Sequence, residues 1–123
     1  MKNGGQPQPI LERTFNFAVR IVKLCVHLDE KRGSARVLGP QILRAGTSVG
    51  ANVEEAQGAQ SKADFNSKMS IALKEARETH FRLRVLMASG VVAKSRLNPL
   101  VSEADEIQRV IGAIIVSSKG GNA

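Results

Sequence analysis

The sequence is short of aromatic residues. It has no Trp and no Tyr, and only four Phe among its 123 residues. A β-sandwich normally places aromatic side chains on its sheet faces, so this composition disfavours that class. Apolar residues still make up 42 % of the chain, which is ordinary for a globular protein. We therefore expect an aliphatic core of Leu, Ile, Val and Ala, a composition that favours helices.

Cysteine and long apolar runs are scarce as well. Cys25 is the single cysteine, so no intrachain disulfide can form, which is typical of proteins in the reducing cytoplasm. No run of about 18 apolar residues exists, so we predict no membrane span. The polar start MKNGGQPQP does not resemble a signal peptide. We expect a cytoplasmic protein with one domain, because a chain of this length suits a single core.

Acidic residues are too few to balance the basic ones. The chain has 18 Lys and Arg against 11 Asp and Glu, which gives a formal net charge of +7. Such an excess attracts polyanions and steers their encounter with the protein. The same excess keeps many soluble proteins dispersed, so composition leaves both nucleic-acid binding and a plain solvated surface open.

Four blocks of the sequence show helical periodicity. We predict helices over about Ile10–Leu28, Pro40–Gln57, Ser61–Ser89 and Ser95–Ser118. Residues 10–118 form one domain in this interpretation, and residues 1–9 and 119–123 are expected to be disordered tails. Short connections make successive helices antiparallel neighbours. The predicted fold class is all-α, an up-down-up-down four-helix bundle.

Proline, glycine and a capping signal set the predicted helix ends. Pro40 and Pro99 are expected in the first turns of the second and fourth helices, where the missing N–H does no harm. Gly90 is expected to end the third helix. Ser61, followed three residues later by Asp64, resembles a capping box that starts it.

The first predicted helix is apolar over too wide an arc for one core. One stripe runs through Phe17, Ile21 and Leu24. A second stripe lies beside it and contains Leu11, Phe15, Ala18, Val22 and Val26. A helix that is apolar this far round buries more than one face. It is either central in the fold or it also contacts another subunit.

Motifs for catalysis and metal binding are not found. His27 and His80 each lack a second ligand at metal-binding spacing. The glutamates of the second and third helices lack the Glu-x-x-His spacing of di-metal bundles. Cys25 lies on the apolar arc, so we expect a buried, unreactive thiol. We predict no enzymatic activity, no catalytic residue, no metal and no cofactor.

A polar row accompanies the apolar stripe of the second predicted helix, in the run RAGTSVGANVEEAQG. It consists of Arg44, Ser48, Asn52 and Glu55. Polar groups at the edge of a core must find partners or cost about 1–3 kcal/mol each. The expected partners on the third helix are Glu75, Glu78 and Arg82. We favour a structural hydrogen-bonded layer over a ligand site.

The third predicted helix carries a basic face, with six basic and three acidic residues in the block Ser61–Gly90. Lys74, Arg77, Phe81 and Arg84 lie away from its predicted core stripe. Such a face can hold phosphates and stack a base. It can equally be solvated, with Phe81 packed against another subunit. We favour the subunit contact for Phe81 and leave both interpretations open for the basic residues.

The run RAGTSVGANVEEAQG followed by SKADF, together with IALKEARETHFRL, resembles the 23S rRNA-intervening sequence protein family of small four-helix bundles. The resemblance covers roughly Leu11–Ser118. It implies a ring-like homo-oligomer, commonly a homopentamer, and no established enzymatic activity. It places the family motif on Arg44, Ser48, Asn52, Glu55 and Glu78. The chain departs from the family pattern at Phe81, where Trp or Tyr is usual, and at its Gly-Pro step before the second helix.

The resemblance also implies similarity to the accessory variability proteins of diversity-generating retroelements. Those are basic pentamers that bind nucleic acid and a reverse transcriptase. From the residues and the resemblance together we predict a non-enzymatic homo-oligomer whose basic surface, including Lys74, Arg77, Phe81 and Arg84, binds RNA or DNA. The alternative is a protein–protein scaffold that binds no nucleic acid.

Overall fold

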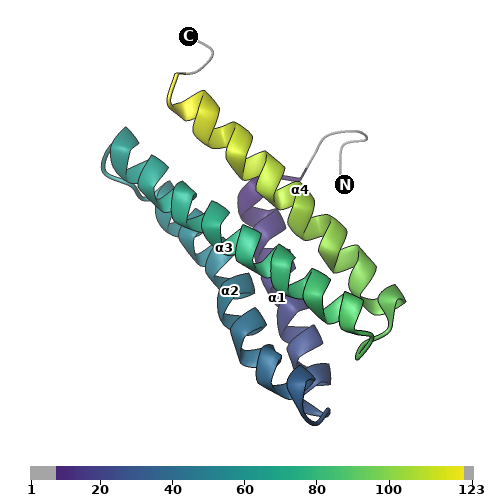
Figure 1. Cartoon of the computed structure of the whole chain (residues 1–123). Coiled ribbons are helices and arrows are strands. Elements are labelled where there is room, and N and C mark those ends of the chain that lie inside the picture. Colours follow the sequence, from purple (N-terminus) through teal and green to yellow (C-terminus); the bar gives the residue numbers. More distant parts are fainter. Residues whose placement is uncertain (1–7, 121–123) are drawn as a thin grey trace.

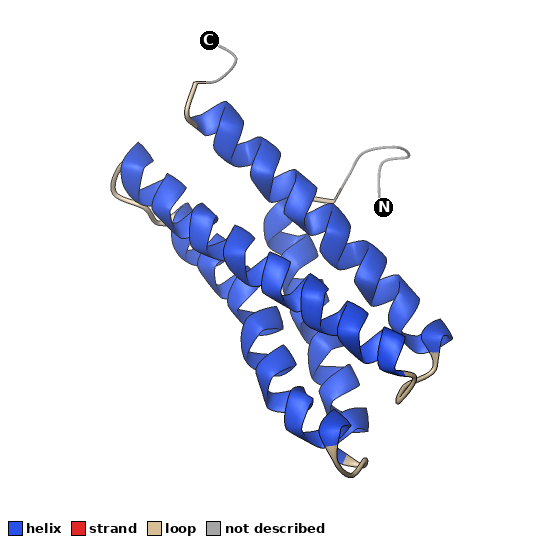
Figure 2. Cartoon of the chain, viewed as in Figure 1, coloured by secondary structure: helices blue, strands red, loops and turns tan. Residues whose placement is uncertain are grey.

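The computed structural model describes residues 8–120, which form four helices (Figure 1). They are α1 (Ile10–Asp29), α2 (Ser34–Gln57), α3 (Lys62–Ser89) and α4 (Lys94–Ser118). No strand occurs in this part of the chain (Figure 2). Successive helices run antiparallel, so the prediction of an all-α four-helix bundle is confirmed. Most of the two predicted tails, 1–7 and 121–123, lies outside the described residues.

The core is aliphatic, as the composition predicts. Each helix packs against two neighbours in the order α1–α2–α3–α4–α1. Phe17 is the one fully buried phenylalanine. The largest other side chains with no exposed surface are Ile21, Leu28, Ile42, Leu83, Leu86, Leu97, Ile107 and Ile111. Each such side chain stabilises the fold by about 1.5–3 kcal/mol relative to an exposed one, which makes this core the main source of stability.

The predicted start of the second helix at Pro40 is wrong. α2 begins six residues earlier, at Ser34, and Pro40 lies inside it. The apolar stripe continues before the proline, because Ala35 and Gly39 are buried against the core. Pro40 and Arg36 are both exposed, so the carbonyl that loses its usual donor faces water. Burial on one side of the helix therefore outweighs the cost of a proline on its solvated side.

Pro99 likewise lies beyond the first turn of its helix. α4 begins at Lys94, which makes Pro99 the sixth residue rather than one of the first four. Pro99 and Ser95, four residues before it, are both exposed. Water can therefore bind the carbonyl that has no N–H partner within the helix.

The ends of α3 follow the predicted signals. The Ser61 hydroxyl accepts a hydrogen bond from the Asp64 N–H at 3.0 Å. The Asp64 carboxylate accepts one from the Gln60 N–H at 3.2 Å. At the other end, Gly90 adopts a φ of 78°, a left-handed conformation that favours glycine. The Ser61 cap and the glycine stop are confirmed, whereas the return bond of the capping box goes to the Gln60 N–H instead of the Ser61 N–H.

Candidate functional site

Arg44 joins α2 to α3 through two carboxylates. Its Nη1 lies 3.2 Å from Oε1 of Glu75, and its Nη2 lies 2.7 Å from Oε2 of Glu78. Arg82, one turn beyond Glu78, donates from Nε to the same Glu78 oxygen at 2.9 Å. Glu75 is buried, so Arg44 supplies the charge partner that its carboxylate needs.

The hydrogen bonds in this cluster favour the charged forms of Arg44 and Glu78. The hydrogen bond from Arg82, followed by the one from Arg44, lowers the pKa of Glu78 against the opposing effect of desolvation. The hydrogen bonds to Glu78 and Glu75 raise the pKa of Arg44. A carboxylate held ionised between two guanidinium groups is a poor general base or acid. The cluster therefore acts as a clamp between helices.

The rest of the polar row divides into two kinds. Ser48 donates to the Arg44 carbonyl at 2.7 Å, and Asn52 donates to the Ser48 carbonyl at 2.9 Å. Both side chains thus bond to their own helix, contrary to the expected contacts with α3. Glu55 does reach α3, where its carboxylate lies 3.4 Å from Nζ of Lys68. The row is therefore tied to α3 at two points and to its own backbone between them.

The basic residues predicted on α3 lie on its outer side. Lys74, Arg77 and Arg84 are exposed, and none forms an ion pair with a carboxylate of residues 8–120. Phe81 is 56 % exposed, and Cζ of Arg84 lies 5.7 Å from the centroid of its ring. This distance allows a cation–π contact. We call these four residues the α3 basic face.

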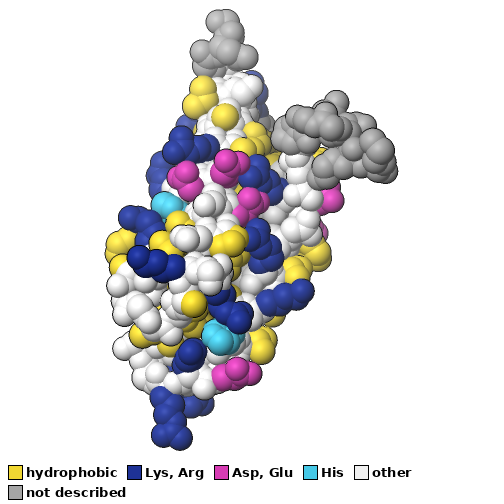
Figure 3. Space-filling model, turned by 90° about the vertical axis from the view of Figure 1, so that its right-hand side faces the viewer, with side chains coloured by type: hydrophobic (Ala, Val, Ile, Leu, Met, Phe, Trp, Pro, Cys, Tyr) yellow, Lys and Arg dark blue, Asp and Glu magenta, His cyan; other side chains and the backbone are white. Residues whose placement is uncertain are grey.

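Basic side chains are spread over one side of the molecule, among apolar and uncharged residues (Figure 3). Figure 3 shows Lys and Arg side chains distributed over one face of the bundle, with a few carboxylates between them. His80 adds little positive charge to the protein, because burial, and then the nearby Arg84, lowers its pKa. The positive potential of this surface therefore comes from Lys and Arg, which keep their charge over the physiological pH range.

Groups suited to metal or thiol chemistry are not brought together. In the described part of the chain, no cluster of three or more His, Cys, Asp or Glu residues could hold a metal ion. Cys25 is buried, and its thiol lies 3.5 Å from the Gly39 carbonyl oxygen. Burial, with a smaller effect of Asp29, raises the pKa of Cys25 to about 11. The predicted buried thiol is confirmed, and it is protonated at neutral pH.

The second apolar stripe of α1 is exposed in the single chain. Its exposed members are Leu11, Phe15, Val22 and Val26, and the structure adds Val19. Phe15 is 63 % exposed and Val26 is 58 % exposed. We call these five residues, with the half-buried Ala18, the α1 apolar stripe.

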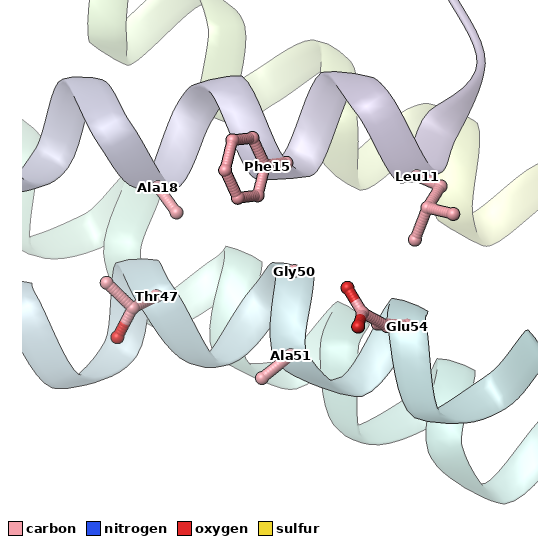
Figure 4. A pocket seen from close by; sticks show the side chains of 7 residues that line it. All are labelled: Leu11, Phe15, Ala18, Thr47, Gly50, Ala51 and Glu54. Carbon is pink, nitrogen blue, oxygen red and sulfur yellow. The ribbon is translucent and has the colours of Figure 1, made fainter.

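A groove of about 170 Å³ lies along this stripe, between α1 and α2. Figure 4 shows Leu11 and Ala18 directed from α1 toward α2, where Gly50 faces them. Gly50 and Ala51 are the smallest residues that line the groove from α2. The small residues of α2 keep the groove open. Among the residues that line the groove, only Glu54 is charged, so most of its surface is suited to apolar contact.

The ion pairs of Arg13 could not be found from the sequence. Arg13 donates from Nε to Glu103 at 2.7 Å and from Nη2 to Glu106 at 2.9 Å. These hydrogen bonds raise the pKa of Arg13 further above its ordinary value. The partners lie 90 or more residues away, on α4, so no local pattern links them. Arg13 is consequently compensated and adds little to the basic surface.

The fold and this surface define a small basic four-helix-bundle protein. Similarity to known proteins identifies its family. The chain belongs to the 23S rRNA-intervening sequence protein family, whose model matches residues 8–113. It is also similar to a solved protein of unknown function from the S23 ribosomal protein family of Bacteroides thetaiotaomicron. The two are 38 % identical with a TM-score of 0.81, and the match covers 87 % of this chain and 98 % of the other. No curated protein matches the sequence.

The described helices also differ from membrane-spanning segments. None of them combines the length and the apolar character that a bilayer-crossing helix needs. The apolar stripe of α1 is one edge of an amphipathic helix, since Glu12, Arg20 and Lys23 are exposed on the same helix.

Proposed function

We propose that the protein is a non-enzymatic homo-oligomer that binds RNA or DNA through the α3 basic face. The observation that carries this proposal is the set of three exposed cations, Lys74, Arg77 and Arg84, without an ion-pair partner among the described carboxylates. Cations that are not compensated by the protein release counterions from a nucleic acid when they bind its phosphates. Binding of this kind depends strongly on salt and weakly on base sequence.

The α1 apolar stripe supports self-association. Two chains with a net charge of +7 repel each other, so copies approach most easily through a surface that carries little charge. The stripe runs from Leu11 to Val26, about 22 Å along the helix at 1.5 Å per residue. The ring of five implied by the family resemblance would cover this surface on every subunit.

The contact between Arg84 and Phe81 bears on how the basic face would work. The guanidinium group lies near the ring at 5.7 Å, and more than half of the side chain is exposed. A ring in this setting can stack a base, and the adjacent guanidinium can bind the neighbouring phosphate. If Phe81 is instead a subunit contact, Phe81→Ala changes the assembly mass and not the affinity for single-stranded RNA.

A salt titration with matched variants tests the nucleic-acid proposal. A labelled 20-nucleotide single-stranded RNA is titrated at 50 and 200 mM salt with the wild type and with Lys74→Gln/Arg77→Gln/Arg84→Gln. The control, Arg32→Gln/Arg36→Gln/Lys62→Gln, removes the same charge from exposed positions elsewhere. We expect the first variant to reduce the slope of log K against log salt by about 2, at roughly 0.7 per phosphate contact. Equal affinity and slope in all three proteins would contradict the proposal.

A protein–protein scaffold is the second candidate function. The observation that favours it is the apolar content of the outer side of α3, where Ile71, Phe81 and Val85 are 40–56 % exposed. A protein partner, such as the reverse transcriptase suggested by the resemblance, could cover these side chains. A partner that copurifies after nuclease treatment, and is lost with Phe81→Glu/Val85→Glu, would support this candidate.

A further inference from the structure

A second basic surface lies where α1 meets α4. The antiparallel arrangement places the middle of α1 beside the start of α4 and forms a groove of about 220 Å³. Its lining consists of Arg20, Lys23, Leu24, Arg96, Pro99 and Leu100. Three of these six residues are cations, and no local sequence pattern groups them.

The charge of this groove is not compensated by the described protein. No carboxylate lines it, and its three cations form no ion pair with a carboxylate of residues 8–120. Arg13 provides the contrast, because it lies two turns before Arg20 and is held by Glu103 and Glu106. The acidic residues of α4 therefore neutralise one end of the α1–α4 contact and leave the other end positive.

The start of α4 adds to this positive end. Its first turn contains no acidic residue, and no side chain caps its free N–H groups. Arg96 is the third residue of the helix, so the positive end of the helix dipole lies beside the cations of the groove. An anion there would meet three side-chain charges and a favourable dipole.

The volume of the groove and its apolar floor indicate which type of anion can bind there. Sites that enclose a small molecule usually measure about 300–1,000 Å³, and this groove is smaller and open to solvent. Leu24 and Leu100 are buried and form an apolar floor. A phosphate group with part of its attached sugar fits this setting, whereas a fully enclosed nucleotide does not.

We propose that the groove of Arg20, Lys23 and Arg96 binds the phosphodiester backbone of a nucleic acid, as a second contact separate from the α3 basic face. The inference rests on the proposed function and adds a location to it. The groove lies on the α4 side of α1, whereas the apolar groove lies on the α2 side. The two grooves share no lining residue, so the phosphate site and the apolar stripe are distinct surfaces of α1.

The test compares Arg20→Gln/Lys23→Gln/Arg96→Gln with the same-charge control Arg32→Gln/Arg36→Gln/Lys62→Gln, using the labelled 20-nucleotide RNA. We expect the groove variant to reduce the salt slope by about 2 and the control to leave it unchanged. The conservative variant Arg20→Lys/Arg96→Lys keeps the charge and should keep the wild-type slope. Circular dichroism checks that each variant retains its helices; if the triple variant does not fold, Arg20→Gln and Arg96→Gln alone should each lower the slope by about 0.7.

The outcomes separate this inference from the proposed function. If the α3 variant lowers the slope and the groove variant matches the wild type, the groove assignment is overturned while the proposed function stands. If the wild type does not bind RNA, both the groove assignment and the proposed function are wrong. Vesicles containing phosphatidylglycerol form the second arm, because lipid headgroups also present phosphate. Loss of vesicle binding in the groove variant with unchanged RNA binding would assign the groove to a lipid and overturn the inference.

Discussion

Gly46 of α2 lies directly against Ile21 of α1. A β-carbon placed on Gly46 would stand 2.8 Å from Cγ1 and 2.9 Å from Cγ2 of Ile21. Both residues are buried, so the Ile21 side chain occupies the space that a side chain at position 46 of α2 would need. This contact fixes the spacing of α1 and α2, and with it the width of the apolar groove on their outer side.

Gly46→Ala should therefore destabilise the protein although alanine is the better helix former. Alanine gains about 1 kcal/mol in helix propensity, but overpacking against Ile21 costs about 1–3 kcal/mol. We expect a net loss of about 1 kcal/mol in urea unfolding. Gly112→Ala is the matched control, because no other part of the described chain comes within 4 Å of the place that its β-carbon would take, and it should stabilise α4 by about 0.5–1 kcal/mol. A gain of the same size at both sites would contradict the close contact.

Removal of the Arg44 guanidinium should lower the stability of the protein, because the buried carboxylate of Glu75 then has no ion-pair partner. Arg44→Met leaves a buried carboxylate with no ion pair, and we expect a lower free energy of unfolding than that of the wild type. Glu75→Gln in the same chain should recover part of that loss. Ser48→Ala should change stability by no more than about 0.5 kcal/mol, since Ser48 bonds only to its own helix. Equal losses for Arg44→Met with and without Glu75→Gln would show that the pair is not coupled.

The lowered pKa of Glu78 gives stability a defined dependence on pH. Between the lowered pKa of Glu78 and the ordinary pKa of a glutamate, the unfolded chain binds this proton and the folded chain does not. The contribution is therefore fully present above the ordinary pKa and is lost as pH falls through the lowered one. Tm measured from pH 6 to pH 3 should fall less steeply for Glu78→Gln than for the wild type. Parallel curves for the two proteins would refute this role of Glu78.

Cys25 should resist alkylation in the folded protein. Its pKa of about 11 leaves only about one thiol in a thousand as thiolate at pH 8, and its side chain is buried. We expect iodoacetamide to modify native protein at least about 100-fold more slowly than protein unfolded in guanidinium chloride. Mass spectrometry of timed samples measures both rates, and comparable rates would mean that the thiol is accessible in the native state.

The sequence predicts the parts of this structure that depend on local pattern. Four apolar periodicities give the four helices, and Ser61 and Gly90 give both ends of α3. The predicted start of α2 is wrong, because the preference of proline for the first turn is a local rule. Burial of Ala35 and Gly39 extends the helix before Pro40, and that burial depends on the position of α1. The contact of Arg13 with Glu103 and the groove of Arg20 and Arg96 join distant segments, so only the packed structure brings them together.

The proposal of self-association rests on an apolar stripe that one chain leaves uncovered. Phe15→Glu places a charge on the stripe at a position that is 63 % exposed in the single chain, so the bundle itself should keep its fold. Val116→Glu is the control, because Val116 is 60 % exposed but lies on α4. A contact between copies at the stripe would make the two substitutions differ in their effect on the mass of the assembly.

Sedimentation equilibrium of the wild type and these two variants tests this account most directly. The account predicts a wild-type mass that is a multiple of 13.2 kDa, with five copies expected from the family resemblance. It also predicts the same assembly for Val116→Glu and a smaller species for Phe15→Glu. A folded wild type that sediments at 13.2 kDa across the micromolar range would contradict it.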